Sequence, residues 1–143
     1  MAQQRKILIV DDEAYVSTVL AIKFKNAGEL VTTAADGEEG FLAAQQELPD
    51  LVITDFQMPI FSGLEMARKL KAEPSTAHIP LLMLTARGHR LLPSEMGQTN
   101  IRAVLDKPFS VREVVMRANE IIAASGGPAA PARPVRPAKA GTR

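Results

Sequence analysis

Hydrophobic positions along the chain form two alternating patterns. Five short stretches are apolar almost throughout, and helix-like segments with spaced apolar residues separate them. Apolar runs of this length, without polar alternation, are typical of strands covered on both faces, as in a parallel sheet. The predicted strands are Lys6–Val10, Leu30–Ala34, Leu51–Asp55, Pro80–Leu84 and Ile101–Leu105.

The segments between these strands carry helix start and stop signals. Three of them open with a polar residue followed three positions later by glutamate, which predicts a capping box. These openings are at Asp36, Ser62 and Ser110. Gly28 and the pair Gly126–Gly127 are predicted to end the first and last helices. Strands that alternate with helices five times predict a doubly wound α/β fold with a parallel sheet in the order 2-1-3-4-5.

The segment from 87 to 100 has the weakest helical pattern. Pro93 suits a first helical position, but Gly97 and Asn100 disfavour continuation of a helix. A short or irregular helix is therefore expected between the fourth and fifth strands.

Length and composition fit one domain with a tail. Hydrophobic residues make up 46% of the 143 residues and aromatic residues only 4%, so the core is expected to be aliphatic. The predicted domain is residues 1–125. Residues 126–143 are rich in proline, alanine and basic side chains, and a segment of this composition is expected to be disordered.

Charge and residue usage exclude several classes of protein. Four of the 17 lysines and arginines lie in the tail, which leaves 13 against 16 acidic residues before it, so nucleic-acid binding is not expected. The chain has no cysteine and two histidines, which excludes disulfides and disfavours a histidine-rich metal site. No signal peptide or membrane-spanning run is recognisable, so a cytoplasmic location is expected.

Chemically active side chains follow the predicted strands. The first strand ends in Asp11 and Asp12, the third in Asp55, the fourth at Thr85 and the fifth before Lys107. Because parallel strands end at the same edge of the sheet, these side chains are expected to converge there.

Three converging carboxylates repel one another and raise one another's pKa unless a cation lies among them. A hard divalent ion such as Mg2+ suits a few carboxylates and water. A carboxylate, Mg2+, an ammonium and a hydroxyl are together the groups needed to receive a phosphoryl group.

The same residues carry a resemblance to a known family. Asp11-Asp12-Glu13 after an apolar strand, Asp55 within Asp-Phe-Gln-Met-Pro, Gly63, Thr85-Ala86 and Lys107-Pro108-Phe109 resemble the receiver domain of two-component response regulators. The similarity covers residues 5 to about 124. It implies a flavodoxin-like (βα)5 fold and resembles the stand-alone, single-domain members of that family.

The resemblance also implies roles for individual residues. Asp55 would accept a phosphoryl group from a histidine kinase or a histidine phosphotransfer protein, and Thr85 and Lys107 would contact that group. Asp12, Asp55 and the backbone carbonyl of Gln57 would bind Mg2+ directly, and Asp11 would act through water. The Lys107–Pro108 peptide bond would be cis.

The chain departs from the family pattern on the side that usually transmits the signal. Val104 stands where an aromatic residue is usual, and Asn100-Ile101 replaces a small pair at the start of the fifth strand. Asp106 is acidic where apolar residues are more common, and strand alternation is expected to direct it away from the site.

Three other classes of function stay open on the sequence. A magnesium-dependent phosphohydrolase usually needs a second acid two residues after the nucleophile, where this chain has Gln57. A nucleotide-binding module is disfavoured because no glycine-rich loop follows the first strand. A scaffold that works without phosphorylation is compatible with Val104. The leading interpretation is a receiver that signals through an unidentified downstream protein.

Overall fold

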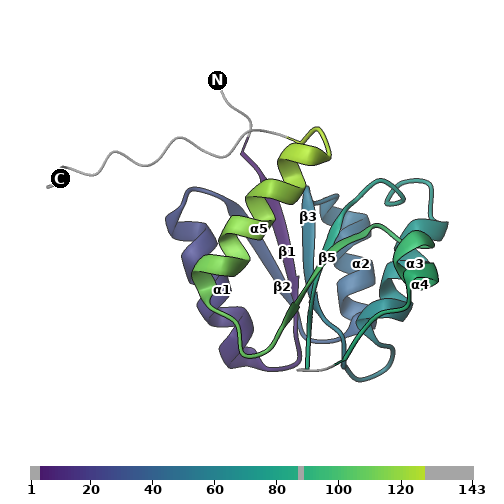
Figure 1. The fold of residues 1–143 in the computed structure, drawn as a ribbon. Helices are drawn as coiled ribbons and strands as arrows, with labels where there is room; N and C mark the ends of the chain where they lie inside the picture. The colour runs from purple at the N-terminus through teal and green to yellow at the C-terminus, as the bar shows by residue number, and fades with distance from the viewer. Residues whose placement is uncertain (1–3, 87–88, 128–143) are drawn as a thin grey trace, which may run out of the picture.

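A computed structural model of the protein describes residues 4–86 and 89–127. Its centre is a five-stranded parallel sheet in the order β2-β1-β3-β4-β5, as the sequence predicts (Figure 1). The strands are β1 (Lys6–Val10), β2 (Leu30–Ala34), β3 (Leu51–Asp55), β4 (Leu81–Thr85) and β5 (Ile101–Asp106). The fourth strand therefore begins and ends one residue later than predicted.

Helices cover both faces of the sheet. They are α1 (Ala14–Asn26), α2 (Gly37–Glu47), α3 (Gly63–Ala72), α4 (Pro93–Gly97) and α5 (Val111–Ala124). In Figure 1, α1 and α5 lie on one side of the strands, and α2, α3 and α4 lie on the other. This is the doubly wound arrangement that the alternation of elements predicts. No helix within the described residues is both long and apolar enough to cross a bilayer.

Each buried strand contributes to two separate cores. In β1, Ile7 and Ile9 pack with the residues of α1 and α5, whereas Leu8 and Val10 pack with those of α2 and α3. Successive side chains of a strand point to opposite faces, so an uninterrupted apolar run is needed to fill both cores. This explains why the strands lack polar alternation.

The three predicted capping boxes form to different extents. Ser62 and Glu65 make both bonds of the box at the start of α3. Asp36 accepts the Glu39 amide, but the Glu39 carboxylate accepts from Ala35 instead of Asp36. At α5, Ser110 accepts the Glu113 amide, and no reciprocal bond is formed. The helix starts are predicted correctly, whereas the complete box is wrong for two of them.

The fourth helix is as short as the sequence indicates. It comprises five residues, begins with Pro93 and buries none of its side chains. The Glu95 carboxylate accepts the Leu92 amide at 2.7 Å, which satisfies one exposed N–H at its start. Of the predicted tail, only Gly126 and Gly127 belong to the described residues, so its disorder stays a prediction.

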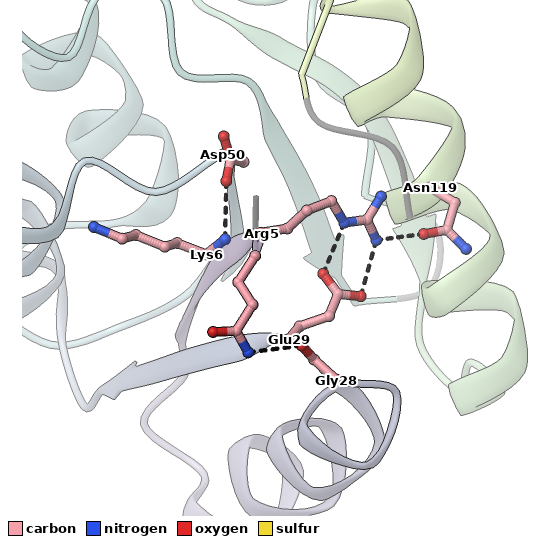
Figure 2. Close-up of polar contacts among 7 residues, drawn as sticks. Arg5, Lys6, Gly28, Glu29, Asp50 and Asn119 are labelled. Atoms are coloured by element: carbon pink, nitrogen blue, oxygen red, sulfur yellow. Dashed lines mark hydrogen bonds and ion pairs between the residues drawn. The ribbon is translucent and has the colours of Figure 1, made fainter. Parts of the chain in front are cut away.

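A buried ion pair joins three elements at the amino edge of the sheet. The Arg5 guanidinium donates to both oxygens of Glu29, at 2.9 and 2.8 Å, and to Asn119 Oδ1 at 2.6 Å (Figure 2). Arg5 precedes β1, Glu29 precedes β2 and Asn119 lies on α5. Arg5 is 1% exposed and Glu29 5%, so each charge depends on the other for solvation. The sequence carries no local signal of this contact.

Breaking this pair on one side should be costly. Glu29→Gln leaves the Arg5 charge buried without its counter-ion, and we expect a loss of about 3–5 kcal/mol in the free energy of unfolding by urea denaturation. Glu120→Gln, which disturbs the exposed Arg117–Glu120 pair at 3.7 Å, should cost less than about 1 kcal/mol. Equal losses in the two variants would contradict this account.

Candidate functional site

Hydrogen bonds that continue the sheet past the strand ends position the predicted site residues. The Asp11 amide donates to the Ala34 carbonyl at 3.1 Å, and the Lys107 amide donates to the Thr85 carbonyl at 2.7 Å. Both bonds prolong the ladders of neighbouring strands. Each of the first residues after β1 and β5 is therefore tied to the neighbouring strand, and its side chain starts from a defined backbone position.

The three predicted aspartates converge as expected. Asp11, Asp12 and Asp55 each offer a carboxylate oxygen, and these oxygens lie within 4.8 Å of one another. Asp11 Oδ1 accepts the Glu13 amide at 2.8 Å, whereas Asp11 Oδ2 is buried and has no hydrogen-bond partner within the described residues. A buried carboxylate oxygen without a donor is costly, and a hard cation would satisfy it. The donor set therefore fits a divalent ion with oxygen ligands.

Lys107 forms the cationic side of the site. Its Nζ lies 3.1 Å from Asp55 Oδ1 and 3.3 Å from Glu13 Oε1. The ammonium thus bridges the central aspartate and the loop after β1. The Lys107–Pro108 peptide bond is cis, as the family resemblance implies.

Thr85 and Gly63 complete the surroundings of Asp55. Thr85 is 1% exposed, and within the described residues its hydroxyl has no hydrogen-bond partner. Leaving a buried hydroxyl unpaired costs about 1–3 kcal/mol, so this group is available to a ligand at the site. A Cβ at Gly63 would overlap the Asp55 carbonyl oxygen, so only glycine lets α3 begin this close to the end of β3.

Burial changes the protonation of these groups. It is the largest effect on Asp11 and raises its pKa to about 6, against the opposing Glu13 amide. Burial also raises the pKa of Asp55, although the Lys107 ammonium opposes this. For Lys107, burial is the largest single effect and lowers the pKa, but its hydrogen bond and attraction to Asp55 together outweigh it and raise the pKa. The cluster therefore holds negative charge at a cost that a bound cation would relieve.

Two contacts at this edge were not foreseen. The ion pair of Lys107 with Glu13 joins positions 94 residues apart, although Glu13 belongs to the acidic run that the sequence highlights. The ring of Phe56, the residue after Asp55, packs at a tilt against the His89 ring, with centroids 4.2 Å apart. The remaining predicted residue, Gln57, lies exposed two positions beyond β3, and Asp106 is exposed at the end of β5.

Comparison with known proteins agrees with this geometry. The model of the response regulator receiver domain matches residues 7–119. The chain belongs to the response regulator receiver family. The receiver fold accounts for the sheet order, and the receiver match spans every element from β1 into α5.

The curated relatives are longer proteins, and this chain matches only part of each. The alkaline phosphatase synthesis transcriptional regulatory protein PhoP of Bacillus subtilis is 37% identical over 121 residues, which cover 82% of this chain and 48% of PhoP. The chain thus spans about half the length of the curated relatives it matches.

Solved receiver structures match over nearly their whole length. A putative response regulator from Chloroflexus aurantiacus has a TM-score of 0.76 and 33% identity, and the match covers 85% of this chain and 99% of that one. The receiver domain of the sensor histidine kinase PA1611 from Pseudomonas aeruginosa has a TM-score of 0.74 and 25% identity, with the same two shares covered. It was solved with a magnesium ion coordinated in its active-site cleft.

Neutralising Asp11 should stabilise the metal-free protein. An acid whose pKa rises on folding, here from 3.8 to about 6, destabilises the folded state progressively as the pH rises through this range. In EDTA at pH 7.5 we expect Asp11→Asn to raise the free energy of unfolding by about 1–3 kcal/mol. The gain should shrink as the pH falls from about 6 and be largely lost below about 4.

The matched control is Asp106→Asn. Asp106 is an exposed aspartate at the end of β5, at the same edge of the sheet as Asp11. Thermal or urea unfolding of both variants across this pH range measures the difference. A gain in Asp106→Asn as large as that in Asp11→Asn, or no gain in Asp11→Asn at pH 7.5, would show that burial and the neighbouring charges do not penalise the Asp11 carboxylate.

Proposed function

We propose that Asp55 is the phosphoryl acceptor of this receiver and that a histidine kinase or histidine phosphotransfer protein is the donor. The observation that carries this proposal is the position of the Asp55 carboxylate. One of its oxygens lies 3.1 Å from the Lys107 ammonium, and the carboxylate offers an oxygen within 4.8 Å of oxygens of Asp11 and Asp12. Among the three aspartates, it is the one that the ammonium contacts directly.

In the proposed phosphoryl transfer, Asp55 is the one residue of the protein that forms a covalent bond. An Asp55 oxygen attacks phosphorus, an O–P bond forms, and the N–P bond of the donor phosphohistidine breaks with its electron pair left on the imidazole nitrogen. Lys107, freed from Asp55 Oδ1, pairs with a phosphoryl oxygen. The unpartnered Thr85 hydroxyl donates to another oxygen of the same group. Positioning and electrostatic stabilisation thus supply the catalysis.

The acidic residues would hold Mg2+. Asp12, Asp55 and the Gln57 carbonyl are the proposed direct ligands, and Asp11 is proposed to act through water. When bound, the ion neutralises charge that builds up on the phosphoryl oxygens. The buried, unpartnered Asp11 Oδ2 supports this assignment, as does the magnesium in the PA1611 receiver domain.

Output through protein contacts is proposed to use the connection from β4 to β5. Val104, the residue at the usual aromatic position, is partly buried against the core that α2 and α3 cover. It has one side-chain torsion and no ring to turn. By contrast, α4 is five residues long, none of its residues is fully buried, and only Met96 packs partly against the core, so few contacts oppose its rearrangement. That this receiver acts as a stand-alone protein stays a prediction.

Removing the nucleophile should abolish labelling. Asp55→Asn keeps the size and shape of the side chain, so we expect a folded protein that takes up no phosphoryl group from acetyl phosphate in Mg2+. Asp106→Asn, the exposed control, should label like the wild type. Intact-protein mass spectrometry, with circular dichroism for the fold, measures both. Full labelling of Asp55→Asn would assign the acceptor elsewhere.

Phosphorylation should change α4 more than Val104. Hydrogen exchange of the protein with and without beryllofluoride, a stable phosphoryl mimic, is expected to show protection gained across Pro93–Gly97. The expected change at Val104 is smaller. Equal exchange of α4 in the two states would contradict a switch there and favour a scaffold that works without phosphorylation.

A further inference from the structure

A groove of about 650 Å3 lies at the amino edge of the sheet, opposite the acidic site. The end of α3, the segment before β4, the start of β5 and the second half of α5 line it. A strand of five residues, about 17 Å long, separates this edge from Asp55. The groove therefore shares no residue with the proposed phosphoryl site.

The groove is basic on a body that is otherwise acidic. Lys71, Arg102 and Arg117 line it together with His78, and Glu120 is its only acidic residue. Within the described residues neither Lys71 nor Arg102 forms an ion pair, and Arg117 has only an exposed pair with Glu120 at 3.7 Å. Lys71 and Arg102 thus keep unpaired positive charge in the groove, whereas Glu120 offsets part of the charge of Arg117.

A buried amide positions two of these cations. Asn100 is 4% exposed, and its Oδ1 accepts from Lys71 Nζ at 3.1 Å and from Arg102 Nη2 at 3.4 Å. Its Nδ2 donates to the carbonyls of Ala77 and Ile79, so the carboxamide is fixed. A neutral amide orients the two cations without cancelling their charge. This gives a structural role to Asn100, one of the residues that departs from the family pattern.

A strand irregularity brings Arg102 to the groove. Leu81 pairs with Ile101 and Leu82 with Ala103, so Arg102 is an extra residue in the β4–β5 ladder. In a regular strand, consecutive side chains point to opposite faces, yet Arg102 and Ala103 both line the groove. A bulge re-aims side chains in this way and is common on edge strands such as β5.

We propose that this groove binds an acidic segment of a partner protein. Its charge favours carboxylates, and its apolar lining, which includes Ala77, Ala103 and Ile121, suits aliphatic side chains between them. A volume of about 650 Å3 exceeds what a single small anion fills and lies in the range of specific ligand sites. Nucleic acid is the less suitable ligand, because it needs a broad basic surface rather than one groove on an acidic body.

Binding of a defined acidic peptide tests this proposal. The probe is a fluorescein-labelled peptide of sequence EDLEDL, added to the full chain at 50 mM salt and followed by fluorescence anisotropy. We expect Lys71→Glu and Arg102→Glu each to weaken binding at least tenfold. Asn100→Ala, which keeps both cations but removes their anchor, should weaken it about threefold. Arg112→Glu is the matched control on the exposed surface of α5 outside the groove, and should change binding less than twofold.

Amide chemical-shift mapping of the same titration locates the site. Shifts confined to the amino edge, at His78, Asn100 and Arg102, support the groove. Shifts centred on Lys107, or equal losses in Arg112→Glu and Arg102→Glu, would overturn it, as would no detectable binding. A single-stranded oligonucleotide of equal charge that binds more tightly at the groove would also overturn the choice of a protein partner.

The result is independent of the proposed phosphoryl chemistry. Lys71→Glu and Arg102→Glu should take up phosphoryl groups from acetyl phosphate like the wild type, because both residues lie at the opposite edge of the sheet. Failure of Asp55 to accept a phosphoryl group would leave the groove intact, and loss of peptide binding would leave the acceptor assignment intact.

Discussion

The confinement of three carboxylates at one edge of the sheet is the constraint on which the site depends. Parallel strands of nearly equal length must end together, and Asp11, Asp12 and Asp55 lie at two such ends. Burial, with a smaller contribution from the neighbouring carboxylates, raises the pKa values of Asp11 and Asp55. The Lys107 ammonium offsets part of this electrostatic cost. Asp11 Oδ2 still has no hydrogen-bond partner within the described residues, and a bound cation would relieve the remaining cost.

The packing behind this edge fixes the positions of the polar residues at the site. The two cores made by the alternating faces of each strand hold the ladders rigid, so the polar residues just beyond them are well placed. Gly63 lets α3 begin against the Asp55 carbonyl without a clash. The short α4, which buries no residue, is by contrast the least anchored element near the site. The start of α3 is thus tightly packed, whereas the neighbouring α4 has few contacts that fix its position.

The opposite edge of the sheet uses buried polar side chains for a different purpose. Arg5, Glu29 and Asn119 join two strand starts to α5 through a closed set of hydrogen bonds (Figure 2). Asn100 instead leaves the charges that it holds facing the groove. A buried ion pair that is complete within the chain is a structural contact. Cations oriented by a neutral amide keep their charge for a partner.

Local sequence patterns were enough to predict the fold class, the sheet order and the residues at the carboxyl edge. Strand alternation is a local pattern, and parallel topology then brings Asp55, Thr85 and Lys107 to one edge without further information. The short α4 was also predictable, because Pro93 and Gly97 act through local backbone preferences.

Contacts between distant segments could not be predicted from the sequence and are known from the folded structure alone. Arg5 with Glu29 and Asn119, and Lys107 with Glu13, join positions whose spacing carries no periodic signal. The bulge at Arg102 depends on how β5 meets β4, and the incomplete boxes at Asp36 and Ser110 depend on side-chain geometry. Local patterns specify which elements form, whereas pairing partners and side-chain directions follow from packing those elements together.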